Sequence, residues 1–467
     1  MRKTLLIGVS AFILGAGTMA YINQRAAASI PSQRSDTFRL LELFGDVLAT
    51  VQNQYVTPVD DKKLIESAID GMLTALDPHS GYLNAANFAD MRDQTRGAYG
   101  GLGLEVTSED GVVKIISPMD DTPAARAKLR AGDYITAINN QSLIGLTLTE
   151  AVKQMRGKPG EAITLTIVRD RGDPFDVKLV RETINIVSAK ARMEGDYGYL
   201  RVSAFNEKTT TEASLALNDL LAKNPNIKGL VLDLRNNPGG LLDQAIGISD
   251  MFLDGGEVVS QRGRDPKDIA RYNAQAGDIT RGLPLVVLIN SGSASASEIV
   301  AGALQDRQRA ELVGLTSFGK GSVQTVIPLR GGADGALKLT TAKYYTPSGR
   351  SIQKTGIEPD LEVAISKEQA EILATRAYQF SEASYSNALD SQEGKERRAA
   401  HAPAEVPPEG FDTKTGDFQL TRALDVLKNG GVAKTPKMAP LPVKPHLAEL
   451  LGNKAAQTAP GAGKPKP

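Results

Sequence analysis

The chain has no cysteine and only three histidines, His79, His401 and His446, among its 467 residues. The lack of cysteine excludes disulfides, a thiol nucleophile and thiolate metal sites. Only His79 lies in a segment that reads as folded, so we expect no histidine-rich metal site. A serine–histidine triad would have to recruit His79 from far away in the sequence. Basic and acidic residues both number 54, so the charge gives no reason to expect nucleic acid as a partner.

The N-terminus has the pattern of an export signal. Arg2 and Lys3 precede an apolar run, 5–22, and small residues follow as far as Ala28. This pattern predicts a signal peptide over residues 1–28; an uncleaved anchor in the inner membrane is the alternative, because the run nearly reaches the length of a bilayer span. In either case we expect the rest of the chain to be periplasmic or otherwise extracytoplasmic.

Residues 36–96 have the spacing of helices. Apolar side chains recur there at intervals of three and four residues, and a second helical pattern, 63–76, stops at a turn with proline and glycine, 77–81. His79 lies in this turn. We expect it to be a hydrogen-bonded turn residue, and a catalytic role is the less favoured alternative.

Residues 97–170 change to short strands with one helical stretch, 147–155. A glycine-rich loop opens this region, and the missing side chains would let successive backbone N–H groups turn inward around a carboxylate. With the turn at 129–133, this order of elements resembles a PDZ domain; a small β-rich domain whose glycines only make turns is the alternative. The resemblance implies that a substrate C-terminus binds at the loop residues Gly100, Gly101, Leu102 and Gly103.

Residues 171–365 alternate between strand and helix patterns, which indicates an α/β sheet. The run 283–290 is apolar almost throughout, as expected of a strand that is buried on both faces. Sites in such sheets form at the carboxyl ends of strands, and a serine-rich turn begins directly after this run. We therefore expect the chemistry at this turn.

The serine-rich turn offers four candidate nucleophiles, Ser291, Ser293, Ser295 and Ser297. A helix is expected to begin near Ser295, so its hydroxyl would lie at the positive end of the helix and the Ala296 N–H could bind an oxyanion. Ser293 could instead be the residue that caps the helix. The spacing alone does not separate Ser293 from Ser295.

Lys320 lies between Gly319 and Gly321, which allow the backbone to approach closely. A lysine can activate a serine as general base only when it is neutral. We therefore expect a buried Lys320 with a lowered pKa and no carboxylate near enough to restore its charge. A phosphate-binding lysine is the alternative, but the GxxxxGKS/T pattern of phosphate loops is missing.

The stretch 291–324 resembles the active-site segment of the carboxyl-terminal processing proteases, the tail-specific serine peptidases of family S41. With the PDZ-like region and the segment 337–363, the resemblance extends over residues 36–365. It implies a ClpP/crotonase-like α/β protease core of mixed sheet and helices over residues 171–365, with an inserted β-rich PDZ domain and N-terminal helices.

The resemblance also implies the role of each site residue. It selects Ser295 as the nucleophile, Lys320 as the general base and Gln324 as the amide that orients the lysine. It forms the oxyanion hole from the backbone N–H groups of Gly239 and Ala296. For Gly239, a strand-ending turn without a part in catalysis is the alternative. The resemblance implies no metal and no cofactor.

The implied function is that of an exported serine endopeptidase whose PDZ domain recognises the free, apolar C-termini of protein substrates. The family also suggests a homo-oligomer and leaves room for an adaptor protein. The main alternative is a catalytically silent PDZ scaffold that binds C-terminal tails. An α/β hydrolase is excluded by the lack of a GxSxG elbow.

Residues 366–467 lie beyond the resemblance. We expect a helix at their start, followed by a linker and a disordered tail, because a composition rich in proline, lysine and alanine cannot bury a core. An amphipathic pattern at 418–431 predicts one helix that docks back on the core or binds a partner.

Overall fold

The computed structural model describes residues 31–437, apart from residues 110, 120, 144, 171, 266 and 414 and the segments 377–380 and 392–402. The predicted export signal, 1–28, and the tail from residue 438 onward lie outside the described residues. The chain divides into two units, 1–72 and 73–467. No helix in the described ranges is long and apolar enough to cross a membrane.

The first unit is helical, as predicted. It contains α2 (Pro31–Gln54) and most of α3 (Asp61–Thr74), and Gln52 donates a hydrogen bond to the Asp61 carboxylate at 2.8 Å across the turn between them. Large apolar side chains of α2 are exposed: Phe38, Leu40, Leu41, Leu43, Phe44 and Val47. This unit by itself therefore leaves the apolar face of α2 uncovered.

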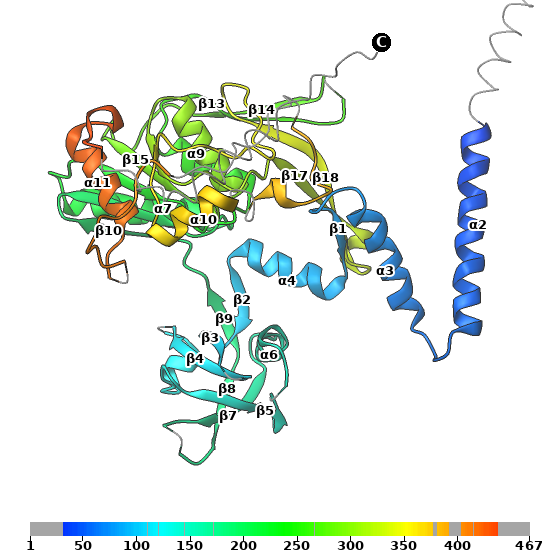
Figure 1. The fold of residues 1–467 in the computed structure, drawn as a ribbon. Coiled ribbons are helices and arrows are strands. Elements are labelled where there is room, and N and C mark those ends of the chain that lie inside the picture. The colour runs from blue at the N-terminus through cyan, green and yellow to red at the C-terminus, as the bar shows by residue number, and fades with distance from the viewer. Residues whose placement is uncertain are drawn as a thin grey trace, which may run out of the picture. The chain divides into compact units, whose positions relative to one another are not determined.

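The PDZ-like module is built on an antiparallel sheet (Figure 1). Its strands follow the order β3-β4-β5-β7-β8, with β6 paired to β5, and α6 (Leu148–Met155) begins with a capping box between Thr147 and Glu150. Its short elements are β3 (Leu104–Glu109), β4 (Val112–Pro118), α5 (Pro123–Arg126), β5 (Tyr134–Ile138), β6 (Gln141–Ser142), β7 (Ala162–Val168) and β8 (Phe175–Val180). Fully buried isoleucines and leucines fill the space between sheet and helix.

The main sheet of the second unit has the order β10-β11-β12-β15-β16-β19, and all its pairs are parallel except β10 with β11. Its strands are β10 (Ala189–Glu194), β11 (Tyr197–Val202), β12 (Leu230–Asp233), β15 (Leu285–Ile289), β16 (Glu311–Gly314) and β19 (Leu361–Glu362). Every residue of β15 is buried, which confirms the prediction of a strand covered on both faces.

Helices cover both faces of this sheet. One face packs against α7 (Thr209–Lys223), α8 (Leu242–Asp250) and α9 (Ala296–Asp306), and the other packs against α11 (Phe418–Asn429). The alternating residues Val286 and Val287 of β15 belong to opposite faces, as the pleat of a strand requires.

A second sheet brings the N-terminal turn to the catalytic segments. Its order is β1-β18-β13-β14, with β17 paired to β18; β1 comes directly after the turn that contains His79. Its strands are β1 (Gly81–Leu83), β13 (Gly256–Arg262), β14 (Ile269–Ala274), β17 (Ser322–Pro328) and β18 (Ala336–Tyr345). Because β1 precedes the PDZ-like module and pairs with β18, which follows it, the module is an insertion. α4 (Ala85–Arg96) and the paired strands β2 (Ala98–Gly101) and β9 (Glu182–Asn185) flank the module.

The region after residue 366 is only in part the predicted linker. It begins with the predicted helix, α10 (Lys367–Arg376), and α11 buries Phe418 and Val426 against the main sheet, which confirms the predicted amphipathic helix and its docking on the core. Within the stretch predicted as linker, however, the side chain of Glu405 forms a buried ion pair with Arg422 at 2.6 Å. Composition gives no sign of this contact, because it depends on where α11 places Arg422.

Candidate active site

Ser295 lies where the turn after β15 enters α9. It is the N-cap residue of α9, and its φ of 54° and ψ of −111° are in a region that residues with a Cβ rarely adopt. Ser295 is nearly buried, with 9% of its surface exposed to solvent. The strand and the helix thus hold this serine in a strained conformation at the edge of the sheet.

The neighbouring serines have structural roles. Ser293 Oγ donates to the Leu234 carbonyl and Ser297 Oγ donates to the Asn237 carbonyl, both at 2.8 Å. Both serines are fully buried. The geometry therefore favours Ser295 over these two neighbours, a choice that spacing alone left open.

Gly239 packs directly against the serine turn. Its φ is +95°, and a Cβ there would lie 2.6 Å from the Ala294 carbonyl oxygen and 2.9 Å from the Ala296 nitrogen. Only glycine fits this approach, which brings the two predicted oxyanion-hole residues together. In this conformation the Gly239 N–H donates to Asn237 Oδ1 at 2.9 Å.

Lys320 is buried, and burial is the main reason that its pKa falls to about 8; Lys338 lowers the pKa further. Three carboxylates, those of Glu382, Glu298 and Asp77, act to raise the pKa, but they do not restore it to its ordinary value. None of them belongs to the segment around the lysine, so the local sequence gave no sign of them. Desolvation outweighs all three charges.

Glu298 is a functional residue that the sequence reasoning missed. Its fully buried carboxylate accepts four hydrogen bonds at 2.5 to 2.9 Å. The donors are the Ser317 hydroxyl and the backbone N–H groups of Ser295, Gly319 and Lys320. One carboxylate therefore joins the serine turn to the lysine loop.

The charge of Glu298 follows from these partners. Burial raises its pKa to about 7, and the four hydrogen bonds oppose the rise. All four partners donate to the carboxylate, so these hydrogen bonds stabilise its ionised form. A signal was available in the sequence, because Ser295-x-x-Glu298 at a helix start is a capping-box pattern.

Gln324 lies on β17 and is bound to other neighbours in this conformation. Its amide nitrogen donates to Ser322 Oγ at 2.9 Å and to Thr340 Oγ1 at 3.3 Å. Among the described residues, no hydrogen bond joins Lys320 Nζ to Ser295 or to Gln324. The Ser295 and Lys320 backbones are joined through the Glu298 carboxylate, whereas Gln324 is bound to side chains of its own sheet.

His79 is a hydrogen-bonded turn residue, as expected. Its Nε2 lies 2.7 Å from Glu382 Oε2. The turn is held by Asp77, whose carboxylate accepts from the backbone N–H groups of His79 and Ser80 at 2.9 Å. Nothing brings His79 into a hydrogen bond with Ser295.

A cavity of about 720 Å³ opens beside the serine turn and Lys320. Its wall combines the turn after β12, the serine turn, the lysine loop and the C-terminal segment near residue 381. The lining residues are Asn236, Pro238, Ser291, Gly292, Ala294, Phe318, Lys320, Ser381, Ser384 and Tyr385. This space is large enough for several side chains of a polypeptide, and it is the candidate substrate cleft.

The PDZ-like module has a narrow groove of about 100 Å³ between β3 and α6. Three of the four predicted loop residues, Gly101, Leu102 and Gly103, line it, whereas Gly100 packs against the Gly157 carbonyl oxygen. The other lining residues are Tyr99, Leu104, Val106, Val152, Met155 and Arg156. The groove thus has an apolar floor beside a glycine-rich loop.

Arg156 adds a charge that the sequence reasoning overlooked. Its guanidinium lies 4.7 Å from the centre of the Tyr99 ring, and its Nε is buried without a hydrogen-bond partner. A buried guanidinium nitrogen without an acceptor is unfavourable.

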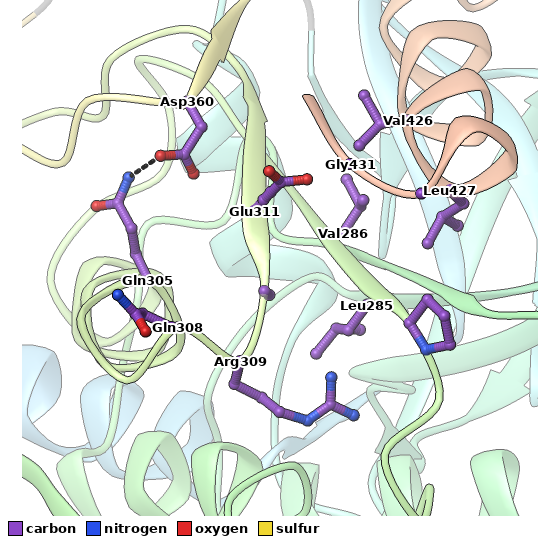
Figure 2. Close-up of a pocket in the computed structure, with 13 residues that line it drawn as sticks. Leu285, Val286, Gln305, Gln308, Arg309, Glu311, Asp360, Val426, Leu427 and Gly431 are labelled. Atoms are coloured by element: carbon purple, nitrogen blue, oxygen red, sulfur yellow. Dashed lines mark hydrogen bonds between the residues drawn. The ribbon is translucent and has the colours of Figure 1, made fainter. Parts of the chain in front are cut away.

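A second large cavity, of about 510 Å³, lies at the opposite ends of the strands (Figure 2). It is lined by the first residues of β15 and β16 and by α11. Its polar side chains are engaged within the fold: Gln305 donates to Asp360 at 3.2 Å, and Arg309 binds the Phe252 and Leu283 carbonyl oxygens. We therefore assign no function to it. In the described ranges, no group of three acidic or histidine side chains could hold a metal ion.

The strained serine at a helix start, the buried lysine with a lowered pKa and the groove of the PDZ-like module are features expected of a serine-type peptidase. Sequence comparison leads to the same class. Residues 196–363 match the model of peptidase family S41, residues 91–168 match the PDZ domain, and residues 9–87 match the N-terminal domain of the activating protease CtpB.

Two relatives and one solved structure illustrate the similarity. A carboxy-terminal-processing protease of Bartonella bacilliformis is 54% identical over 75% of this chain and 81% of that protein. A probable CtpA-like serine protease of Staphylococcus epidermidis is 37% identical over 69% of this chain and 65% of that protein. The structure of a photosystem II D1 C-terminal processing protease, 30% identical, covers 67% of this chain and 88% of its own, with a TM-score of 0.42. The chain belongs to the carboxy-terminal-processing proteases of peptidase family S41.

Proposed function

We propose that this protein is an exported serine endopeptidase that binds the free, apolar C-terminus of a protein substrate and cleaves the chain with a Ser295–Lys320 dyad, assisted by Gln324. The observation that carries the proposal is the buried Lys320 beside the strained serine turn, with a pKa lowered to about 8. A lysine in that range can exchange a proton with a serine hydroxyl near neutral pH.

In the proposed reaction, neutral Lys320 removes the proton from Ser295 Oγ as the oxygen attacks the scissile carbonyl carbon. The N–H groups of Gly239 and Ala296 bind the oxyanion, and protonated Lys320 then gives its proton to the leaving amine. Water attacks the acyl-enzyme in the second half, with Lys320 again as the base. The close packing of Gly239 on the Ala296 nitrogen supports this oxyanion hole.

The conformation described here requires two local changes before it can act. The Gly239 N–H must leave Asn237, and Lys320 must come within hydrogen-bond distance of Ser295. We propose that a C-terminus in the PDZ groove favours these changes and aligns Lys320 with Gln324. If a chain without residues 99–169 cleaved as fast as the whole protein, this activation would be wrong.

The PDZ groove supports recognition of free C-termini. Gly101 and Gly103 leave backbone N–H groups without covering side chains, and the floor formed by Val152 and Met155 suits an apolar last residue. The unpartnered Nε of Arg156 would then meet the terminal carboxylate. Amidation of the substrate terminus should therefore weaken binding.

We also propose that the protein is exported, has a ClpP/crotonase-like core and forms a homo-oligomer. The N-terminal pattern supports export with the signal cleaved or retained as an anchor, and the mixed sheets with flanking helices are compatible with a ClpP/crotonase-like core. The exposed apolar face of α2 supports a homo-oligomer. An adaptor that delivers substrates remains compatible with the exposed groove.

The test compares the exported part of the protein with its Ser295→Ala variant on an unfolded substrate that ends in a free apolar residue, and on the amidated form of that substrate. We expect cleavage of the free-tailed substrate by the unmodified protein alone. Cleavage by the Ser295→Ala variant would refute the nucleophile, and equal cleavage of both substrates would refute recognition of the terminus. Binding without cleavage would favour the catalytically silent scaffold.

A further inference from the structure

The C-terminal segment 381–390 lies at the active site, although it follows the catalytic motifs in sequence and lies beyond the family resemblance. Ser381, Ser384 and Tyr385 share the cavity of about 720 Å³ with Lys320. The Tyr385 ring also contacts the rings of Phe318 and His79, with centroid distances of 6.4 and 6.1 Å. A part of the chain without a known role therefore forms one wall of the candidate substrate cleft.

Glu382 anchors this wall. Its side chain is fully buried, with one carboxylate oxygen 2.7 Å from His79 Nε2 and the other accepting from Gln353 Nε2 at 2.9 Å. Its backbone N–H donates to the Phe318 carbonyl at 3.0 Å. A buried carboxylate with this many partners is costly to remove and fixes its surroundings.

The same contacts reach the lysine loop. Gln353 is held by Glu382, and its Oε1 accepts from the Gly321 N–H at 3.0 Å. Glu382 therefore contacts Phe318 through its backbone N–H and reaches Gly321 through the side chain of Gln353, and these two residues flank the loop that carries Lys320. The Glu298 carboxylate holds the backbone of Gly319 and Lys320 directly, from its own position in α9.

The far end of the segment is attached as well. Lys354 Nζ donates to the Asp390 carboxylate at 2.7 Å, and Asn387 Nδ2 donates to the Thr74 carbonyl at 2.9 Å. The Asp390 side chain is 94% exposed, so its ion pair with Lys354 is weak. The buried contacts of Glu382 therefore dominate the attachment.

We propose that Glu382 is a positioning residue of the peptidase: it fixes the lysine loop through Phe318 and Gln353 and holds the segment 381–385 as a wall of the substrate cleft. This inference rests on the proposed role of Lys320 as general base. It assigns a catalytic contribution to a region after residue 366 that composition alone describes as a linker.

The charge of Glu382 should also affect the pH–rate profile, which a purely structural role would leave unchanged. The charged groups that act on Lys320 are Lys338, Glu382, Glu298 and Asp77, and Glu382 is the strongest of the three carboxylates that raise its pKa. A Glu382→Gln substitution keeps the shape and removes the charge. It should therefore lower the pKa of Lys320 and move the acid limb of the pH–rate profile to lower pH.

The experiment measures kcat, KM and the pH–rate profile of the full exported chain and of Glu382→Ala, Glu382→Gln, Lys320→Ala and Glu405→Gln, on an unfolded polypeptide with a free apolar C-terminus. Thermal unfolding of each variant is measured in parallel. Glu405→Gln is the matched control, because it alters a buried carboxylate of the same C-terminal region whose ion pair is with Arg422 of α11.

We expect Glu382→Ala to lower kcat by about tenfold or more, because Gln353 loses the carboxylate that holds it against the Gly321 N–H of the lysine loop. KM should rise with the loss of the wall, and Glu382→Gln should keep more activity and shift the acid limb to lower pH. A kcat for Glu382→Ala within about twofold of the unmodified protein would overturn the proposal. So would an unshifted Glu382→Gln profile, or an equal loss of kcat in Glu405→Gln. An active Lys320→Ala variant would instead refute Lys320 as the general base. This outcome distinguishes a failure of the proposed function from a failure of the positioning role of Glu382.

Discussion

The contacts of Glu298 predict that replacing one atom should disable the enzyme without unfolding it. In Glu298→Gln, an NH2 group takes the place of one of two oxygens that together accept four hydrogen bonds. If the NH2 group lies toward Ser295 and Lys320, two backbone N–H groups lose their acceptor. If it lies toward Ser317, that hydroxyl can turn to accept, and only the Gly319 N–H is left without a partner.

The second orientation should prevail, because it leaves fewer donors unsatisfied. A buried donor without an acceptor costs about 1–3 kcal/mol. Glu298→Gln should therefore lower the free energy of unfolding by about that amount. If the same cost is felt in the transition state, kcat should fall about 5- to 150-fold, because the lysine loop no longer holds its position relative to Ser295.

The assay measures kcat on an unfolded polypeptide and the free energy of unfolding in urea, with Glu405→Gln as control. Glu405 is buried too, and its carboxylate pairs with Arg422 of α11. We expect both variants to lose stability and only Glu298→Gln to lose turnover. A Glu298→Gln variant with nearly unchanged kcat, or a control that loses as much turnover, would refute the reasoning.

Three further predictions follow from the same structure. Lys320 must be neutral to act, and burial lowers its pKa to about 8. Because the neutral form increases as the pH rises, kcat/KM should rise with pH through about 8. A flat pH–rate profile would contradict the role of Lys320 as the general base. Gly239→Ala should lower kcat about 100-fold or more, because the added Cβ would collide with the Ala294 carbonyl oxygen and displace the Gly239 N–H from the oxyanion hole. Near-normal turnover would show that Gly239 is not part of the oxyanion hole. Phe418→Ala should reduce the free energy of unfolding in urea by about 3–5 kcal/mol, since α11 is part of the core; a change close to zero would indicate a loosely attached helix.

The parts of the fold that the sequence could predict are those whose signal is local. The apolar run that forms β15 must be buried on both faces, whatever its neighbours are. Similarly, the helical spacing of residues 418–429 predicts an amphipathic helix, whatever surface it packs against. Likewise, glycines at 101 and 103 predict a loop that exposes its N–H groups. These features depend on neighbouring residues, so a single sequence contains them.

The parts that it could not predict depend on contacts between distant residues. Glu382 and His79 are 303 positions apart and meet at 2.7 Å. Nothing in the spacing of either residue indicates that contact, and the composition around residue 382 predicted a linker there. The amphipathic pattern of α11 predicts a helix, but only the tertiary structure shows which face of the sheet it covers.

The lowered pKa of Lys320 agrees with the expectation of a buried lysine, but the sequence did not reveal the carboxylates of Glu298, Glu382 and Asp77, which act on it from distant segments. Burial of the amine is the larger effect, and the three carboxylates limit the fall of the pKa to about 8. A general base works best with a pKa near the working pH, because a lysine with a much lower pKa would bind the serine proton too weakly. The carboxylates therefore do two things at once: they hold the loop that carries the base, and they keep its proton affinity high enough for the reaction.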